Sequence, residues 1–314
     1  MSMTAHFFYW PDYRPVTETP EQVAHIRYEY AALLSMCDAS LGNVLDMMDR
    51  HHLWDDTMLI VGTDHGFLLG EHDWWGKWVP PWYDELIHNP LFIWDPRFRV
   101  RAESRAALVQ TIDFGPTLLD YFNAPRTPDM QGVPLTGVIS DDTPVREAGL
   151  FGMFGGMVNV TDGRYVYMRA PAGPDNTPLY EHTLMPTVVD RRADVEELRD
   201  MMLAEPFTFT KGVRTLKIPA VAVIHRLAYT HGYGTMLFDL KTDPGQMRPL
   251  VDDDQERRMI GLMVGLMKSN DAPPSQYERL GLPENGDIRD EHLALAGSHE
   301  STLINIGSGS ANEC

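Results

Sequence analysis

The feature that most constrains the fold is a short apolar run that ends in charged residues. Residues 58–61 read Met-Leu-Ile-Val, and Gly62-Thr63-Asp64-His65-Gly66 follows directly. Consecutive apolar residues without alternation are typical of a strand buried on both faces, as in a parallel sheet flanked by helices. Residues 90–94, Pro-Leu-Phe-Ile-Trp, repeat the pattern. We therefore expect both runs to be strands of such a sheet.

Helical patterns surround these two runs. Thr19-Pro20-Glu21-Gln22 predicts a helix start, because Thr19 can cap, Pro20 suits the first helical position and Gln22 completes a capping box. Apolar residues at helical spacing continue to Met48, and Cys37 lies on this stripe, where we expect it to pack. A second helix is expected from Asp113 through Phe122. Alternation of helix and buried strand favours an α/β fold.

The sequence pattern changes after about residue 145, from alternating helix and buried strand to strand-like runs separated by turns. Thr161-Asp162-Gly163 separates two strand-like runs and predicts an antiparallel hairpin. Residues 234–246 predict a further strand and turn, and residues 254–268 predict an amphipathic helix. We expect a domain of residues 1–145 and a smaller α+β region of residues 146–314, whose tail frays from about residue 298.

Composition excludes several classes of partner. The chain has 314 residues and a formal net charge of −19, which argues against nucleic acid and anionic membrane surfaces. Its two cysteines, Cys37 and Cys314, form no disulfide framework, and no apolar run approaches the length of a membrane span. No signal peptide is visible, so a cytoplasmic location is expected.

The residues after the first apolar run carry the candidate chemistry. In open α/β sheets functional groups gather where strands end in loops, and Asp64 and His65 stand at such a point. A carboxylate beside an imidazole suits a divalent cation, and Lys77 can bind an anionic substrate held there. The alternatives are a simple turn or cap at Asp64-His65, a packing role for His72 and a solvated Lys77. The aromatic side chains of this loop, Trp74, Trp75, Trp78, Trp82 and Tyr83, suit either packing or contact with a sugar or aryl ring.

The order of motifs in residues 20–270 resembles the sulfatase family of the alkaline phosphatase superfamily. The likeness lies in "LGNVLDMMDRHHLWDDT", "TDHGFLLGEHDWWGK", "PLFIWDP", "TIDFGPTLLDYFNAP" and "DMQGVPL". "VTDGRYVYMR" and "LFDLKTDPGQ" resemble segments of the family's smaller C-terminal part. The resemblance implies an alkaline phosphatase-like central sheet flanked by helices, present here in part, followed by a smaller antiparallel-sheet region.

The resemblance also implies roles for individual residues. Asp64 and His65 match metal-binding positions, and His65 and Lys77 match catalytic positions. Lys77 also matches the lysine that binds the sulfate group, and His72 lies in the matched motif as a candidate substrate-binding residue. The implied metal is calcium, with magnesium or manganese as alternatives, and the implied substrate is a small-molecule sulfate ester. A phosphate or phosphonate ester is the alternative within the superfamily.

The family's nucleophile motif is missing from the sequence. Sulfatases form a formylglycine from the first residue of C/S-x-P/A-x-R, but Cys37 is followed by Asp-Ala-Ser-Leu and no serine begins the motif. The chain thus corresponds to the C-terminal half of the enzyme. We expect a truncated enzyme, a non-catalytic interaction module, or a chain that pairs with a separate N-terminal half. Bare apolar surface at the sheet edge predicts self-association.

Overall fold

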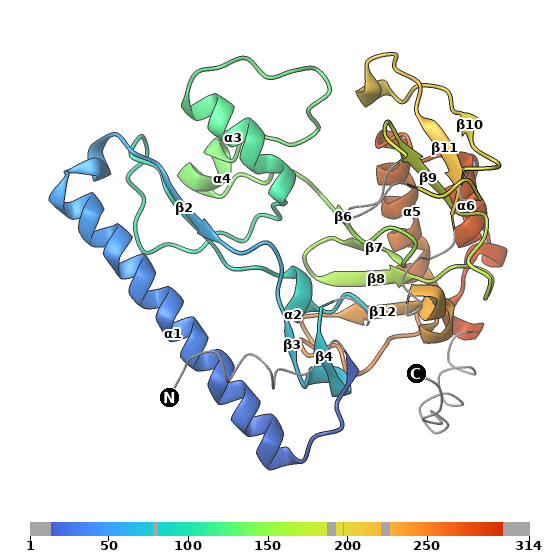
Figure 1. Ribbon diagram of the computed structural model, residues 1–314, viewed down its shortest axis with the longest axis horizontal. Coiled ribbons are helices and arrows are strands. Elements are labelled where there is room, and N and C mark those ends of the chain that lie inside the picture. Colours follow the sequence, from blue (N-terminus) through green and yellow to red (C-terminus); the bar gives the residue numbers. More distant parts are fainter. Residues whose placement is uncertain (1–13, 78–80, 187–192, 197, 221–226, 298–314) are drawn as a thin grey trace. The chain divides into compact units, whose positions relative to one another are not determined.

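Contacts within the chain divide it into two compact units. The computed structural model describes residues 14–77, 81–186, 193–196, 198–220 and 227–297 (Figure 1). The first unit comprises residues 1–107 and 136–143, and the second comprises residues 108–135 and 144–314. The longer segment of the second unit begins at residue 144, close to the expected boundary near residue 145. The second unit also includes residues 108–135. The domain division itself stays a prediction.

The long helix α1 (Pro20–Arg50) dominates the first unit. The predicted capping box is present: Gln22 N donates to Thr19 Oγ1, and Thr19 N donates to Gln22 Oε1. These bonds satisfy amide donors that a helix start would otherwise leave unpaired. The helix ends at Arg50, inside the region where the apolar pattern stops.

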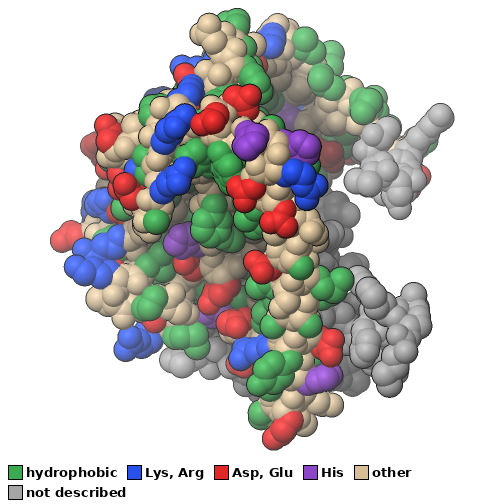
Figure 2. All heavy atoms as spheres, turned by 90° about the vertical axis from the view of Figure 1, so that its left-hand side faces the viewer, with side chains coloured by type: hydrophobic (Ala, Val, Ile, Leu, Met, Phe, Trp, Pro, Cys, Tyr) green, Lys and Arg blue, Asp and Glu red, His purple; other side chains and the backbone are tan. Residues whose placement is uncertain are grey.

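The apolar stripe of α1 is largely uncovered, contrary to expectation. Only Met48 is buried, and the expected packing of Cys37 is wrong because this free cysteine is exposed. Figure 2 shows hydrophobic side chains at the surface of this helix. The exposed apolar side chains of α1 include Tyr28, Leu33, Leu34, Met36, Val44 and Met47. Periodicity marks the face that a helix would bury, but burial also needs a neighbour to pack on it.

Two small sheets and two short helices complete the first unit. One sheet has the order β1-β4-β3 and is antiparallel, and the other pairs β2 with β5. The elements are β1 (Arg14–Pro15), β2 (Leu59–Gly62), β3 (Leu68–Leu69), β4 (Trp74–Gly76), β5 (Leu91–Trp94), α2 (Asp84–Ile87) and α4 (Thr136–Asp141).

The expected parallel arrangement of β2 and β5 is wrong. The two strands pair antiparallel, with Ile60 opposite Ile93, and their side chains are only partly buried apart from the exposed Phe92. An apolar run indicates burial but carries no strand direction. Direction is set by the connection, which passes through β3, β4 and α2 and returns the chain in the opposite sense.

The second unit contains most of the buried core. A four-stranded antiparallel sheet has the order β12-β8-β7-β6, and a three-stranded sheet has the order β10-β11-β9. The strands are β6 (Gly149–Gly152), β7 (Val158–Thr161), β8 (Tyr165–Arg169), β9 (Tyr180–Thr183), β10 (Met202–Leu203), β11 (Leu216–Pro219) and β12 (Met236–Asp239). The helices are α3 (Phe114–Tyr121), α5 (Asp253–Ser269) and α6 (Pro274–Leu280).

The predicted hairpin, the strand at Met236–Asp239 and the amphipathic helix of the second unit are confirmed, and the tail from about residue 298 lies outside the described residues. The β7–β8 hairpin turns at Asp162-Gly163, and Gly163 has a φ of +89° that suits glycine. Helix α5 lies one residue beyond each end of its predicted range and buries Met259, Ile260 and Met263. This face packs in one core with Val160 and Tyr167 of the sheet.

A buried ion pair orders the start of α3. The Arg146 guanidinium donates to both carboxylate oxygens of Asp113, at 2.6 and 2.5 Å, and the amides of Gln110 and Val133 also donate to that carboxylate. Although burial raises the pKa of Asp113, these donors outweigh it and hold the pKa below its usual range. A buried carboxylate is stable when its oxygens are satisfied in this way.

Candidate active site

The loop after β2 presents the first two predicted residues. The Asp64 side chain is 82% exposed and that of His65 is 34% exposed, so neither is sealed in the core. Gly66 follows because no side chain fits there: a Cβ would lie 1.7 Å from the carbonyl oxygen of Glu85. Its amide donates to Leu86 O at 2.9 Å, which fastens the loop to α2.

The hydrogen bonds of His65 define its tautomer. Nδ1 lies 2.7 Å from Gly66 O, which can only accept, so Nδ1 carries the proton. The other ring nitrogen of His65 is Nε2. This nitrogen faces Asp64 Oδ2 at 3.2 Å and Lys77 Nζ at 2.5 Å. His65 Nε2 therefore lies within polar contact distance of both the Asp64 carboxylate and the Lys77 ammonium.

Lys77 reaches His65 through the hairpin of β3 and β4. Leu68 pairs with Gly76 and Leu69 with Trp75, so the residue after β4 returns beside the loop that precedes β3. Lys77 Nζ can then donate to His65 Nε2. The structure thus brings Asp64, His65 and Lys77 together, although twelve residues separate the last two in sequence.

Charge and local bonds keep Asp64 ionised. Although partial desolvation raises the pKa of Asp64, the neighbouring His65, backbone amides and the Lys77 ammonium outweigh it and lower the pKa below its usual value. A carboxylate, an imidazole nitrogen and an ammonium therefore meet at one partly exposed place. Such a set suits a cation or an oxyanion.

The side chain of His72 packs at the other end of the hairpin. Its ring stacks on that of Tyr83 with centroids 3.5 Å apart and planes 5° apart. Nε2 lies 3.5 Å from Glu85 Oε2, and the His72 side chain is only 8% exposed. These contacts give His72 a packing environment, and the predicted contact with substrate stays a prediction.

The described aromatic residues of the loop are buried or partly buried. Trp75 is fully buried, and its Nε1 donates to Glu18 Oε2 at 2.8 Å. Trp74, Trp82 and Tyr83 are partly buried, and Trp78 lies outside the described residues, as does Cys314. Packing therefore accounts for Trp75 and Tyr83, as one of the two sequence interpretations expects.

Three residues around the site escaped the sequence interpretation. Thr63 Oγ1 donates to His65 O at 3.1 Å, and Asn89 Nδ2 donates to Asp64 O at 3.4 Å. Glu85 lies on α2 opposite His72. Thr63 adjoins the Asp-His pair in the sequence, but nothing in the sequence connects Asn89 to Asp64, 25 positions earlier, or Glu85 to His72, 13 positions earlier.

The donor set fits part of a metal centre. Asp64 and His65 carry an oxygen and a nitrogen atom of the kinds that divalent cations take as ligands. No group of three or more His, Cys, Asp or Glu side chains suited to a metal occurs in the described part of the chain. Calcium takes about six to eight oxygen ligands. These residues therefore do not form a complete centre by themselves.

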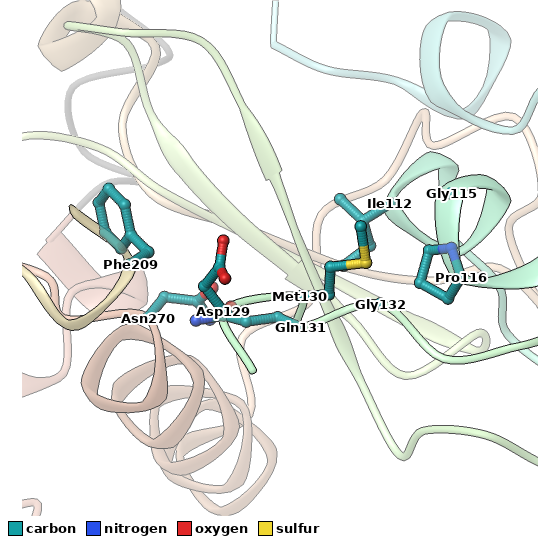
Figure 3. A pocket seen from close by; sticks show the side chains of 9 residues that line it. All are labelled: Ile112, Gly115, Pro116, Asp129, Met130, Gln131, Gly132, Phe209 and Asn270. Atoms are coloured by element: carbon teal, nitrogen blue, oxygen red, sulfur yellow. The ribbon is translucent and has the colours of Figure 1, made fainter. Parts of the chain in front are cut away.

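A separate cavity of about 410 Å³ lies in the second unit, and none of the predicted site residues lines it. Figure 3 shows Asp129 and Asn270 between Phe209 and Met130 in this view. Asp129 is 3.4 Å from Lys211 Nζ. The cavity and the predicted site thus belong to different units.

Comparisons with known proteins agree with the motifs. Residues 1–124 match the family model described as Sulfatase. The N-acetylglucosamine-6-O-sulfatase of Bacteroides thetaiotaomicron is 30% identical over 114 residues, covering 36% of this chain and 20% of that protein. The choline-sulfatase of Rhizobium meliloti is 26% identical over 171 residues, which cover 52% of this chain and 33% of the choline-sulfatase.

A solved structure supports the fold. It is described as being in complex with its substrate D-glucosamine-2-N,6-O-disulfate, and it aligns with a TM-score of 0.56 and 17% identity. The alignment covers 81% of this chain and 42% of that one. At this identity the likeness concerns the fold alone, and the expected mixed α/β fold is confirmed.

Residues 1–124 carry the likeness to sulfatases, and the fold agrees with it. The predicted resemblance to the sulfatase family is confirmed by the family match in residues 1–124 and by the sulfatase relatives. The chain spans about a fifth to a third of the length of these two relatives. No helix in the described residues has the length and apolar character needed to cross a membrane.

Proposed function

We propose that this chain carries one side of the active site of a metal-dependent hydrolase of sulfuric esters. The observation that carries the proposal is the convergence of Asp64, His65 and Lys77, with His65 Nε2 at 3.2 Å from Asp64 Oδ2 and 2.5 Å from Lys77 Nζ. The sulfatase relatives support the choice of a sulfate ester over other oxyanions.

Each of the three residues has a distinct task in the proposal. Asp64 supplies an oxygen ligand of a divalent cation, calcium in the first instance, and His65 Nε2 supplies a nitrogen ligand once the Lys77 ammonium has moved from it to the sulfate group. The cation would neutralise charge on the sulfate group when bound. Lys77 donates to a sulfate oxygen and helps the ester oxygen leave as an alcohol. Hydrolysis transfers the sulfuryl group to water, and the released oxygen takes up a proton.

The nucleophile and the remaining ligands come from outside this chain in the proposal. The resemblance to sulfatases implies a formylglycine, and the chain has no C/S-x-P/A-x-R motif from which to make one. The uncovered stripe of α1 and the partly buried β2–β5 sheet support a second segment that packs there. That segment is an N-terminal sulfatase half, on the same or another polypeptide.

Calcium titration tests the metal site on this chain directly. Isothermal calorimetry of wild type and Asp64→Ala should show binding to the wild type that is at least about tenfold weaker in the variant. Asp38→Asn, which removes an exposed carboxylate from α1, should bind as wild type does. Equal heats for wild type and Asp64→Ala would remove the assigned cation site.

Turnover tests the reaction after the chain is combined with an N-terminal sulfatase half. An aryl sulfate should be hydrolysed faster than an aryl phosphonate, and Lys77→Ala should lower kcat by about 10²-fold, since one lost oxyanion donor commonly costs that much. Faster turnover of the phosphonate would favour the phosphonate hydrolase. No turnover of either ester, with calcium bound, would favour a non-catalytic module.

A further inference from the structure

The contacts of His72 point beyond the motif that contains it. Its Nε2 and Glu85 Oε2 face each other at 3.5 Å, and within the described residues neither buried atom has a hydrogen-bond partner. Buried polar atoms are normally paired, and the imidazole and the carboxylate form an ion pair when His72 is protonated. The Tyr83 ring stacks flat on the imidazole and fixes its plane.

The backbone beneath His72 has an uncommon conformation. Gly70, His72 and Asp73 have φ values of +97°, +52° and +57°. Two of the three carry side chains, which rarely adopt the left-handed region without surrounding support. This turn joins β3 to β4, so its shape sets how far β4 extends before Lys77.

Helix α2 contacts both ends of the hairpin. At the base, Leu86 O accepts the Gly66 amide at 2.9 Å, next to His65. At the tip, Glu85 faces His72. The same four-residue helix therefore touches the segment that holds His65 and the turn that leads to Lys77.

We propose that His72 and Glu85 form a positioning pair that holds the β3–β4 hairpin on α2 and thereby sets the contact between Lys77 and His65. Neither residue touches substrate in this role. The inference rests on the proposed function, because it assigns a task in placing two of its site residues. Active-site groups need support of this kind, since displacement by about 1 Å can cost about 10²-fold in rate.

The test uses histidine side-chain NMR of the full chain and does not depend on activity. His65 ring signals are assigned by His65→Gln, and Lys77→Ala gives the displacement that loss of the contact produces. His72→Gln and Glu85→Gln should each displace the His65 signals in the same direction, by at least about half as much. Asp84→Asn is the matched control, because it breaks an exposed pair with His88 on the same helix and should leave them in place.

The outcomes separate this inference from the proposed function. If Lys77→Ala displaces the His65 signals but neither His72→Gln nor Glu85→Gln does, the positioning pair is refuted and the Lys77–His65 contact stands. If Lys77→Ala leaves them unchanged, the contact itself is absent and both proposals fail. Should His72→Gln not fold, the near-isosteric Glu85→Gln decides by itself, and a lower Tm without displacement counts against the proposal.

Discussion

At the scale of single residues, the site depends on the close contact between the backbone at Gly66 and that of α2 as much as on its charged groups. Asp64, His65 and Lys77 were identifiable from sequence. Their convergence depends on Gly66, whose missing side chain lets the loop lie against α2. The sequence shows a glycine after Asp-His but does not show what it touches, because that neighbour lies nineteen residues further on, at Glu85.

Gly66→Ala should therefore destabilise the first unit. The added Cβ would meet Glu85 O at 1.7 Å, so loop and helix must separate, at a cost of about 1–3 kcal/mol or more. Gly42→Ala is the control: its Cβ meets nothing within 4 Å inside α1, and it should stabilise by about 0.5–1 kcal/mol. Urea unfolding measures both changes. Equal stability of Gly66→Ala and wild type would contradict the packing described here.

At the scale of elements, the hairpin that carries Lys77 is tied to its neighbours by polar bonds. Arg27 on α1 donates to Leu69 O at 2.7 Å and to Glu71 Oε1 at 3.2 Å. Glu18, beside β1, accepts from Trp75 Nε1 and Thr17 N and pairs with Arg14. Although desolvation raises the pKa of Glu18, these donors lower it to about 2.

This lowered pKa makes a prediction about pH. Because the folded pKa of Glu18 is about 2 and its ordinary value is 4.5, the stabilisation is complete above pH 4.5 and is lost as the pH falls toward 2. The stability difference between wild type and Glu18→Gln should be constant above about pH 5 and shrink below it. Urea unfolding followed by tryptophan fluorescence from pH 3 to 6 measures it. A difference that grows with acidity would give the opposite sign and refute the assignment.

At the scale of the whole molecule, the two units differ in how well they bury apolar residues. The second unit encloses a core in which Met259, Ile260, Met263 and Leu237 are inaccessible to solvent. In the first unit, α1 buries one residue of its 31, and β2 and β5 form a sheet of only two strands. Two strands without a covering layer are marginal in water.

The isolated chain should consequently self-associate. Sedimentation velocity is expected to show a mass that rises with concentration, since apolar side chains such as Leu34, 59% exposed, lie along α1. Leu34→Glu should reduce the association, and Ser35→Glu, which adds the same charge off the stripe, should reduce it less. A monomer with a sharp melt at every concentration would contradict this expectation.

The sequence by itself determined the elements that local chemistry specifies. The α1 cap, the β7–β8 hairpin and the α5 helix follow from residues within a few positions of one another, so their patterns are complete in sequence. Motif order likewise predicted the resemblance to the sulfatase family and the three residues that the structure brings together. Tertiary structure alone decided the antiparallel pairing of β2 with β5, the exposure of Cys37 and the contact of His72 with Glu85. Each of these features depends on whether a distant segment packs against the residue or strand, and on which segment it is. A periodic pattern of apolar residues does not specify that neighbour.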